Sequence, residues 1–155
     1  MSLTRYKGAG ILFYKREGGI LSVSLGKRTV RPQKGYWSIP GGKMEAKDRS
    51  SFLDCAIRET REEYFLRNIN RFPAVTINEE SKCRVIIPWF FEYHTYLVNV
   101  TGIELKFNPN WEFSKIEWFN VRHLPAKTHL GVRYALLFFK LNIRKSENIT
   151  HAGYI

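Results

Sequence analysis

Arg58-Glu-Thr-Arg-Glu-Glu63 lies inside a segment with the apolar spacing of an amphipathic helix. Within it, Glu59, Glu62 and Glu63 stand at positions i, i+3 and i+4, so a helix places the three carboxylates on one face. Like charges at this spacing destabilise a helix by roughly 0.2–0.5 kcal/mol per pair. The cluster therefore favours a bound divalent cation, which would turn repulsion into coordination.

Two glycines stand upstream of this segment, in Pro40-Gly-Gly-Lys43. Because glycine lacks a side chain, this turn can bring bare backbone next to the cation. The alternative is an ordinary solvated helix face, since Asp54, Arg58 and Glu62 form an i, i+4, i+8 row of opposite charges. The glycine pair at this distance favours the metal-binding interpretation.

The rest of the chain alternates strand and helix patterns. The predicted strands span residues 8–15, 20–25, 36–39, 74–77, 84–98 (as one long or two short strands) and 115–119, with turns at 17–19 and 108–110. The predicted helices span residues 51–67, capped by Asp48, Ser50 or Ser51, and 130–143. This order predicts an α+β fold, an α/β/α sandwich in which helices cover both faces of a mixed central β-sheet.

Composition predicts one domain over residues 1–155, with a polar, flexible tail over 144–155. The chain has 155 residues, of which 44% are hydrophobic and 15% aromatic, enough for a real core. No apolar run approaches the ~20 residues of a membrane span, and the N-terminus shows no secretory signal. The two cysteines, Cys55 and Cys83, form neither a disulfide framework nor a zinc spacing. We expect a cytoplasmic protein with no membrane partner.

The net charge of +11 favours polyanionic partners: nucleotides, nucleic acid or anionic lipid surfaces. Plain solubility is the alternative explanation, because the basic residues are scattered along the chain.

Residues 42–48 and 58–63 together resemble the Nudix box, the sequence signature of the Nudix (MutT-like) hydrolase family. Trp37-Ser-Ile-Pro-Gly-Gly-Lys43 is similar to the lead-in of that family. Glu112-Phe113, followed by Trp118-Phe119, resembles the segment in which some members place a further metal-binding glutamate. The resemblance covers roughly residues 8–125 and implies a Nudix-type fold.

The chain departs from the family pattern in the spacer and at three positions. The spacer between Asp48 and Arg58 has nine residues where the family has seven, and Asp48 replaces the usual glutamate. Thr60 and Phe65 stand where the family has an aliphatic residue and a glycine. Because Phe65 lacks the easy left-handed conformation of glycine, we expect the helix to run on toward Asn68. The three glutamates are untouched, so activity is still favoured.

The resemblance implies roles for individual residues. The implied ligands of Mg²⁺ or Mn²⁺ are the Gly42 carbonyl and the carboxylates of Glu59, Glu62, Glu63 and Glu112. The implied catalytic residues are Glu62, Glu63, Glu112 and Arg58, with Arg58 holding a glutamate in its working rotamer. We expect Arg28, Lys34 and Lys43 to stabilise negative charge on the substrate. Trp37 is a candidate to stack a base, with a core position as the alternative.

The resemblance implies a Mg²⁺-dependent hydrolase that cleaves the pyrophosphate bond of a nucleoside diphosphate linked to another moiety. The expected partner is a nucleotide-derived small molecule, with RNA a weaker expectation. Two alternatives stay open: a Nudix-fold module that binds nucleotides or RNA without hydrolysis, and a pyrophosphohydrolase acting on RNA 5′ ends. The sequence names neither the nucleotide derivative nor the oligomeric state, and a homodimer is compatible with it.

Overall fold

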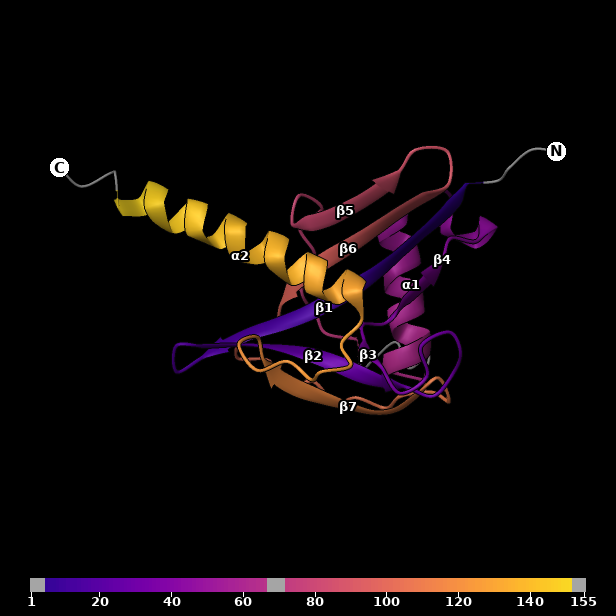
Figure 1. Cartoon of the computed structure of the whole chain (residues 1–155), viewed down its shortest axis with the longest axis horizontal. Helices are drawn as coiled ribbons and strands as arrows, with labels where there is room; N and C mark the ends of the chain where they lie inside the picture. Colours follow the sequence, from indigo (N-terminus) through magenta and orange to yellow (C-terminus); the bar gives the residue numbers. More distant parts are fainter. Residues whose placement is uncertain (1–4, 67–71, 152–155) are drawn as a thin grey trace.

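A mixed β-sheet lies between two helices (Figure 1). The computed structural model describes residues 5–66 and 72–151. Its strands are β1 (Tyr6–Glu17), β2 (Ile20–Arg28), β3 (Trp37–Ser38), β4 (Gly41–Lys43), β5 (Lys82–Ile87), β6 (Phe91–Asn99) and β7 (Phe113–Asn120). The helices are α1 (Phe52–Tyr64) and α2 (Leu130–His151), and a 3-10 turn, η1, spans Ala46–Asp48.

The sheet has the strand order β3-β2-β1-β6-β5, with β4 also paired to β1 and β7 to β2. Only β1 and β6 run parallel among the described pairs, which makes the sheet mixed. The predicted α+β sandwich is confirmed. The predicted segment 84–98 forms two strands, β5 and β6, and Pro88 lies in the turn between them.

Alternation along β1 divides the core between the two faces of the sheet. Ala9, Ile11 and Phe13 point to one face and pack with the buried side of α1. Leu12 points to the other face and packs with a second cluster that includes Val132 of α2. Each helix therefore covers one face, and the parallel β1–β6 pair forms the centre of the sandwich.

Helix α1 begins where the sequence indicates and ends earlier. The Asp54 amide donates to Ser51 Oγ at 3.1 Å, so Ser51 is the N-cap among the three candidates. The prediction that the helix runs on toward Asn68 is wrong, because α1 ends at Tyr64. Phe65 is fully buried against other aromatic rings, and Leu66 adopts the left-handed conformation, with φ of 43°. Burial of the Phe65 ring turns the chain out of the helix.

A loop remote in sequence satisfies the last carbonyls of α1. The Asn108 amide donates to the Tyr64 carbonyl at 2.8 Å, and the Asn110 amide donates to the Glu63 carbonyl at 2.9 Å. The predicted turn around residues 108–110 is thus a docking segment, followed by the turn that begins β7.

Two further predictions differ from the structure. Residues 74–77 form no strand but an irregular segment whose Val75 and Ile77 pack on the core. Helix α2 continues beyond residue 143 to His151, and the flexibility of the tail over 144–155 stays a prediction. None of the described helices combines the length and apolar character that a membrane span requires.

Candidate active site

Arg58 links the start of the site to its glutamates. Its Nε and Nη2 donate to the two carboxylate oxygens of Asp48 at 2.7 and 2.9 Å. Its Nη1 donates to Glu59 Oε1 at 2.9 Å and to Glu62 Oε2 at 3.4 Å. The Asp48 carboxylate is buried, and hydrogen bonding from Arg58 holds its pKa below the ordinary range. Arg58 therefore orients two of the predicted metal ligands.

The long spacer is folded into a compact turn. After η1, Arg49 and Ser50 both adopt left-handed conformations, with φ of 51° and 61°. Two consecutive residues of this kind reverse the chain tightly between Asp48 and the N-cap Ser51. The Asp48–Arg58 contact survives the longer spacer for this reason.

Glu63 forms a pair with Glu112. Its side chain is 5% exposed, and its Oε2 accepts a 2.8 Å hydrogen bond from the Gly41 amide. The pKa of Glu63 is raised to about 10. The main cause is burial, and the second is the hydrogen bond that Glu63 donates to Glu112. Two adjacent carboxylates in a buried site need a shared proton or a cation. This contact brings Glu112 to the acidic face of α1, and its role as a metal ligand stays a prediction.

The docking segment around residues 108–110 brings Glu112 to Glu63, although the two glutamates are far apart in the chain. The Asn110 amide is bonded to the Glu63 carbonyl, and the Asn110 side chain accepts from the Glu112 amide at 2.8 Å. The loop that caps α1 therefore also delivers the second carboxylate.

Gly42 lies directly against Glu59. A Cβ placed on Gly42 would lie 2.6 Å from Glu59 Oε1 and 2.7 Å from Glu59 Cδ. Burial raises the pKa of Glu59, while Arg58 opposes that rise. A residue with any side chain at position 42 would push Glu59 away, which explains glycine here.

The predicted ligands form two neighbouring groups rather than one cluster. Glu59 and Glu62 turn toward Arg58, whereas Glu63 turns toward Gly41 and Glu112. Among the described side chains, no three histidine, cysteine or acidic residues already converge as a metal site. The donor chemistry nevertheless fits a hard cation, because carboxylate and carbonyl oxygens are its preferred ligands. A cation would bind most favourably beside Glu63 and Glu112, where two carboxyl groups are adjacent.

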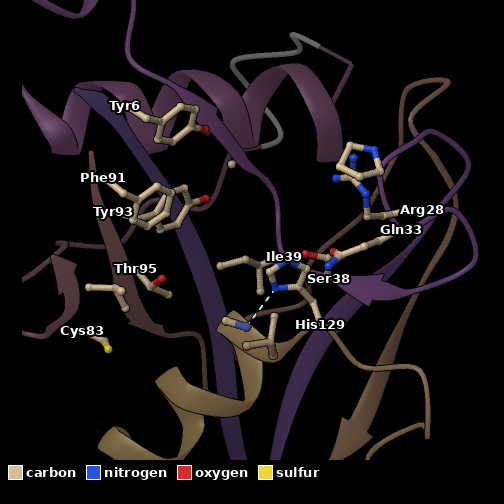
Figure 2. A pocket seen from close by; sticks show the side chains of 15 residues that line it. Tyr6, Arg28, Gln33, Ser38, Ile39, Cys83, Phe91, Tyr93, Thr95 and His129 are labelled. Atoms are coloured by element: carbon tan, nitrogen blue, oxygen red, sulfur yellow. Dashed lines mark hydrogen bonds between the residues drawn. The ribbon is translucent and has the colours of Figure 1, made fainter. Parts of the chain in front are cut away.

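A cavity of about 420 Å³ lies next to these carboxylates. Figure 2 shows Tyr6, Phe91 and Tyr93 at one end of it and Arg28 with Gln33 at the other. The Tyr6 and Phe91 rings stack at 5.2 Å, and the Phe91 and Tyr93 rings at 6.1 Å. Gly41, whose amide holds Glu63, also lines the cavity. The cavity therefore opens beside the carboxylate pair.

The predicted substrate-binding residues have different outcomes. Arg28 lines the cavity. Lys34 and Lys43 are exposed and lie outside its lining, and the Lys43 carbonyl accepts from Arg58 Nη2 at 3.0 Å. The proposal that Trp37 stacks a base is wrong: its ring is buried in the second core cluster, edge-on to Phe119 at 4.7 Å. Pairing of β3 with β2 directs Trp37 into the core.

The aromatic end of the cavity was missed by the sequence reasoning. Tyr6 and Gly8 on β1 pair in register with Phe91 and Tyr93 on β6. Gly8 and Gly10 are two residues apart, so they leave one face of β1 bare beneath these rings. That glycine spacing was the signal in the sequence, but the partner strand could not be read from it.

Comparisons with known proteins agree with the fold. Residues 4–138 match the family model described as NUDIX domain. A curated Caenorhabditis elegans protein named "Putative nudix hydrolase 1" is 25% identical over 118 residues; the match spans 76% of this chain but only 30% of that protein. Two solved structures are similar in fold. RenU, a Nudix hydrolase from M. smegmatis, has a TM-score of 0.58 at 20% identity, covering 97% of this chain and 89% of RenU. A C. elegans Ap4A hydrolase has a TM-score of 0.57 at 19% identity, covering 76% and 81%.

Proposed function

Because this chain belongs to the NUDIX domain family, we propose that it is a Mg²⁺- or Mn²⁺-dependent hydrolase of nucleotide derivatives. The substrate is a nucleoside diphosphate linked to another moiety, and the bond cleaved is its pyrophosphate bond. The C. elegans relative of similar fold, an Ap4A hydrolase, acts on a substrate of this general class.

The pairing of buried Glu63 with half-buried Glu112 carries the proposal. A salt-bridged surface helix would place its glutamates in water beside lysines and arginines. Glu63 instead lies buried against a second carboxyl group, an arrangement that costs stability unless a shared proton or a cation joins it. A protein that keeps such a pair at the edge of a cavity gains from it when a cation is bound.

The residues suited to hold the cation are Glu63, Glu112, Glu59 and the Gly42 carbonyl, with Glu62 at the edge of the group. When bound, a divalent cation neutralises phosphate oxygens and lowers the pKa of a coordinated water. Arg58 keeps Glu59 and Glu62 oriented through its contacts with Asp48. The Gly41 amide fixes the carboxyl group of Glu63 at 2.8 Å.

The cavity accommodates the organic part of the substrate. Its lining is mostly apolar and aromatic, and Arg28 at its far end supplies a cation for a phosphate oxygen. Gly41 joins the cavity to the carboxylates, so a ligand there would present its diphosphate to Glu63 and Glu112.

A substrate panel tests this function. Purified protein is incubated with nucleotide sugars, ADP-ribose, dinucleoside polyphosphates and oxidised nucleoside triphosphates, and the mononucleotides and phosphate released are measured. We expect turnover with Mg²⁺ or Mn²⁺, none in chelator, and loss of turnover in Glu112→Gln but not in the exposed control Glu104→Gln. Ligand binding that persists in chelator, with no product under any metal, would instead identify a binding module.

A further inference from the structure

The tip of the β5–β6 hairpin exposes a run of five nonpolar residues, Ile86-Ile87-Pro88-Trp89-Phe90. Trp89 is 83% exposed, Phe90 61% and Ile87 53%. Single exposed apolar residues are common, but a contiguous exposed run is rare unless it binds something. The tip takes no part in the carboxylate site or in either core cluster.

The tip is held in a defined conformation. The Phe90 amide donates to the Ile87 carbonyl at 3.1 Å, and the Tyr6 amide of β1 donates to the Phe90 carbonyl at 2.8 Å. Trp89 adopts a left-handed conformation with φ of 71°, which is unfavourable for a bulky residue. Trp89 is exposed in this turn. Figure 1 shows that the turn between β5 and β6 lies at the end of the sheet where β1 begins.

Cationic side chains lie on the strands next to the tip. Arg84 on β5 is half-exposed, and Arg5 and the exposed Lys7 lie at the start of β1. The nearby acid Glu92 is already paired, with Arg5 at 3.0 Å and with Arg84 at 3.5 Å. Arg5 and Arg84 share Glu92, and Lys7 is a further exposed cation, in a chain whose net charge is +11.

We propose that this tip docks on an anionic lipid bilayer. Trp89, Phe90 and Ile87 enter the interface between head groups and acyl chains, a region that tryptophan favours. Arg84, Arg5 and Lys7 contact the anionic head groups. The expectation of no membrane partner rested on the lack of an apolar span, and a peripheral contact needs no span.

Charge and shape distinguish the bilayer from a second copy of this chain. Two copies meeting at their tips would bring together the same cationic surroundings, each on a chain of charge +11, and would repel. An anionic surface attracts the same residues. The tip is also a projecting hairpin end rather than a groove, which suits insertion into a deformable interface.

Docking would place the membrane beside the candidate cavity. Phe91 follows the tip directly, and the Tyr6 amide is hydrogen-bonded to the Phe90 carbonyl of the tip. The rings of Phe91 and Tyr6 both line the cavity. Membrane docking by the tip does not depend on hydrolysis at the carboxylate site, so docking and hydrolysis can be tested separately.

Vesicle sedimentation tests the proposal on the full chain. Vesicles of phosphatidylcholine alone are compared with vesicles containing about 30% phosphatidylserine, at low and high salt. We expect binding to the anionic vesicles only, weakened by salt. The double variant W89S/F90S should bind at least about tenfold more weakly with an unchanged melting temperature, since both side chains are exposed. Arg84→Glu should weaken binding as well.

Trp111→Ser is the matched control, because Trp111 is 74% exposed on the loop before β7. It should bind vesicles like the wild type. Absence of binding by the wild type, equal binding to neutral vesicles, or equal binding by W89S/F90S would overturn the proposal. So would a concentration-dependent dimer that W89S/F90S abolishes, since the tip would then serve a second copy.

Discussion

Arg58 binds both carboxylate oxygens of Asp48, at 2.7 and 2.9 Å, across a spacer two residues longer than the Nudix pattern. The shorter arm of aspartate therefore does not break the contact. Because the same guanidinium also reaches Glu59 and Glu62, the pair sets the orientation of the acidic face of α1.

Replacing Asp48 by Asn should destabilise the protein by about 1.5–3 kcal/mol, because Arg58 would lose its two charge-assisted hydrogen bonds to Asp48 while keeping those to Glu59 and Glu62. Arg58→Lys should lose part of this stability, since an ammonium cannot form two parallel hydrogen bonds. Urea unfolding of both single variants and the double variant measures their coupling. Additive effects would show that the two side chains act independently.

The same contact predicts a loss of stability in acid. Arg58 lowers the folded-state pKa of Asp48 below its unfolded value of about 3.9. The ionised Asp48 carboxylate therefore contributes its full stability above the unfolded pKa. This contribution is lost as pH falls through the folded value. The variant Asp48→Asn should lose this part of the pH dependence of stability. Thermal melts between about pH 2 and pH 6, which bracket the unfolded pKa of about 3.9, measure the difference.

Glu63→Gln should abolish turnover and yet stabilise the metal-free protein by on the order of 1–3 kcal/mol at neutral pH. The pKa of Glu63 is about 10 in the folded state. In the unfolded chain the pKa of a glutamate is about 4.3. Stability of the wild type therefore falls as pH rises between these values, and the glutamine removes that slope.

Melting curves against pH, with and without Mg²⁺, check this prediction. Mg²⁺ should raise the melting temperature of the wild type and not that of Glu63→Gln. A variant that kept near-wild-type turnover would show that Glu63 is not part of the metal site.

Gly42→Ala should reduce turnover by at least about 100-fold while leaving the fold intact. The new Cβ meets the end of the Glu59 side chain, which can move aside, rather than the backbone. Activity assays with circular dichroism of the same sample separate the two effects. Unchanged turnover would mean that Glu59 does not need its present position.

Trp37→Ala should cost about 3–5 kcal/mol of stability, as expected for a buried aromatic residue. The exposed Trp111→Ala should change stability by less than about 0.5 kcal/mol. Urea unfolding measures both. If Trp37→Phe raised KM without changing stability, Trp37 would be a substrate contact rather than a core residue.

Local features of this chain were readable from its sequence because they depend on neighbours along it. Helical spacing placed Glu59, Glu62 and Glu63 on α1, a serine marked its start, and alternation marked the long strands. These features, with the Nudix resemblance, led to the correct fold and family.

Contacts between distant segments had to come from the tertiary structure. Docking of Asn108 and Asn110 satisfied the last carbonyls of α1 and brought Glu112 to Glu63, 49 positions away in sequence. Parallel pairing of β1 with β6 put Tyr6 beside Phe91 and formed the cavity, while Trp37 entered the core. Residue spacing encodes which face a side chain occupies, but strand pairing and loop docking choose what that face meets.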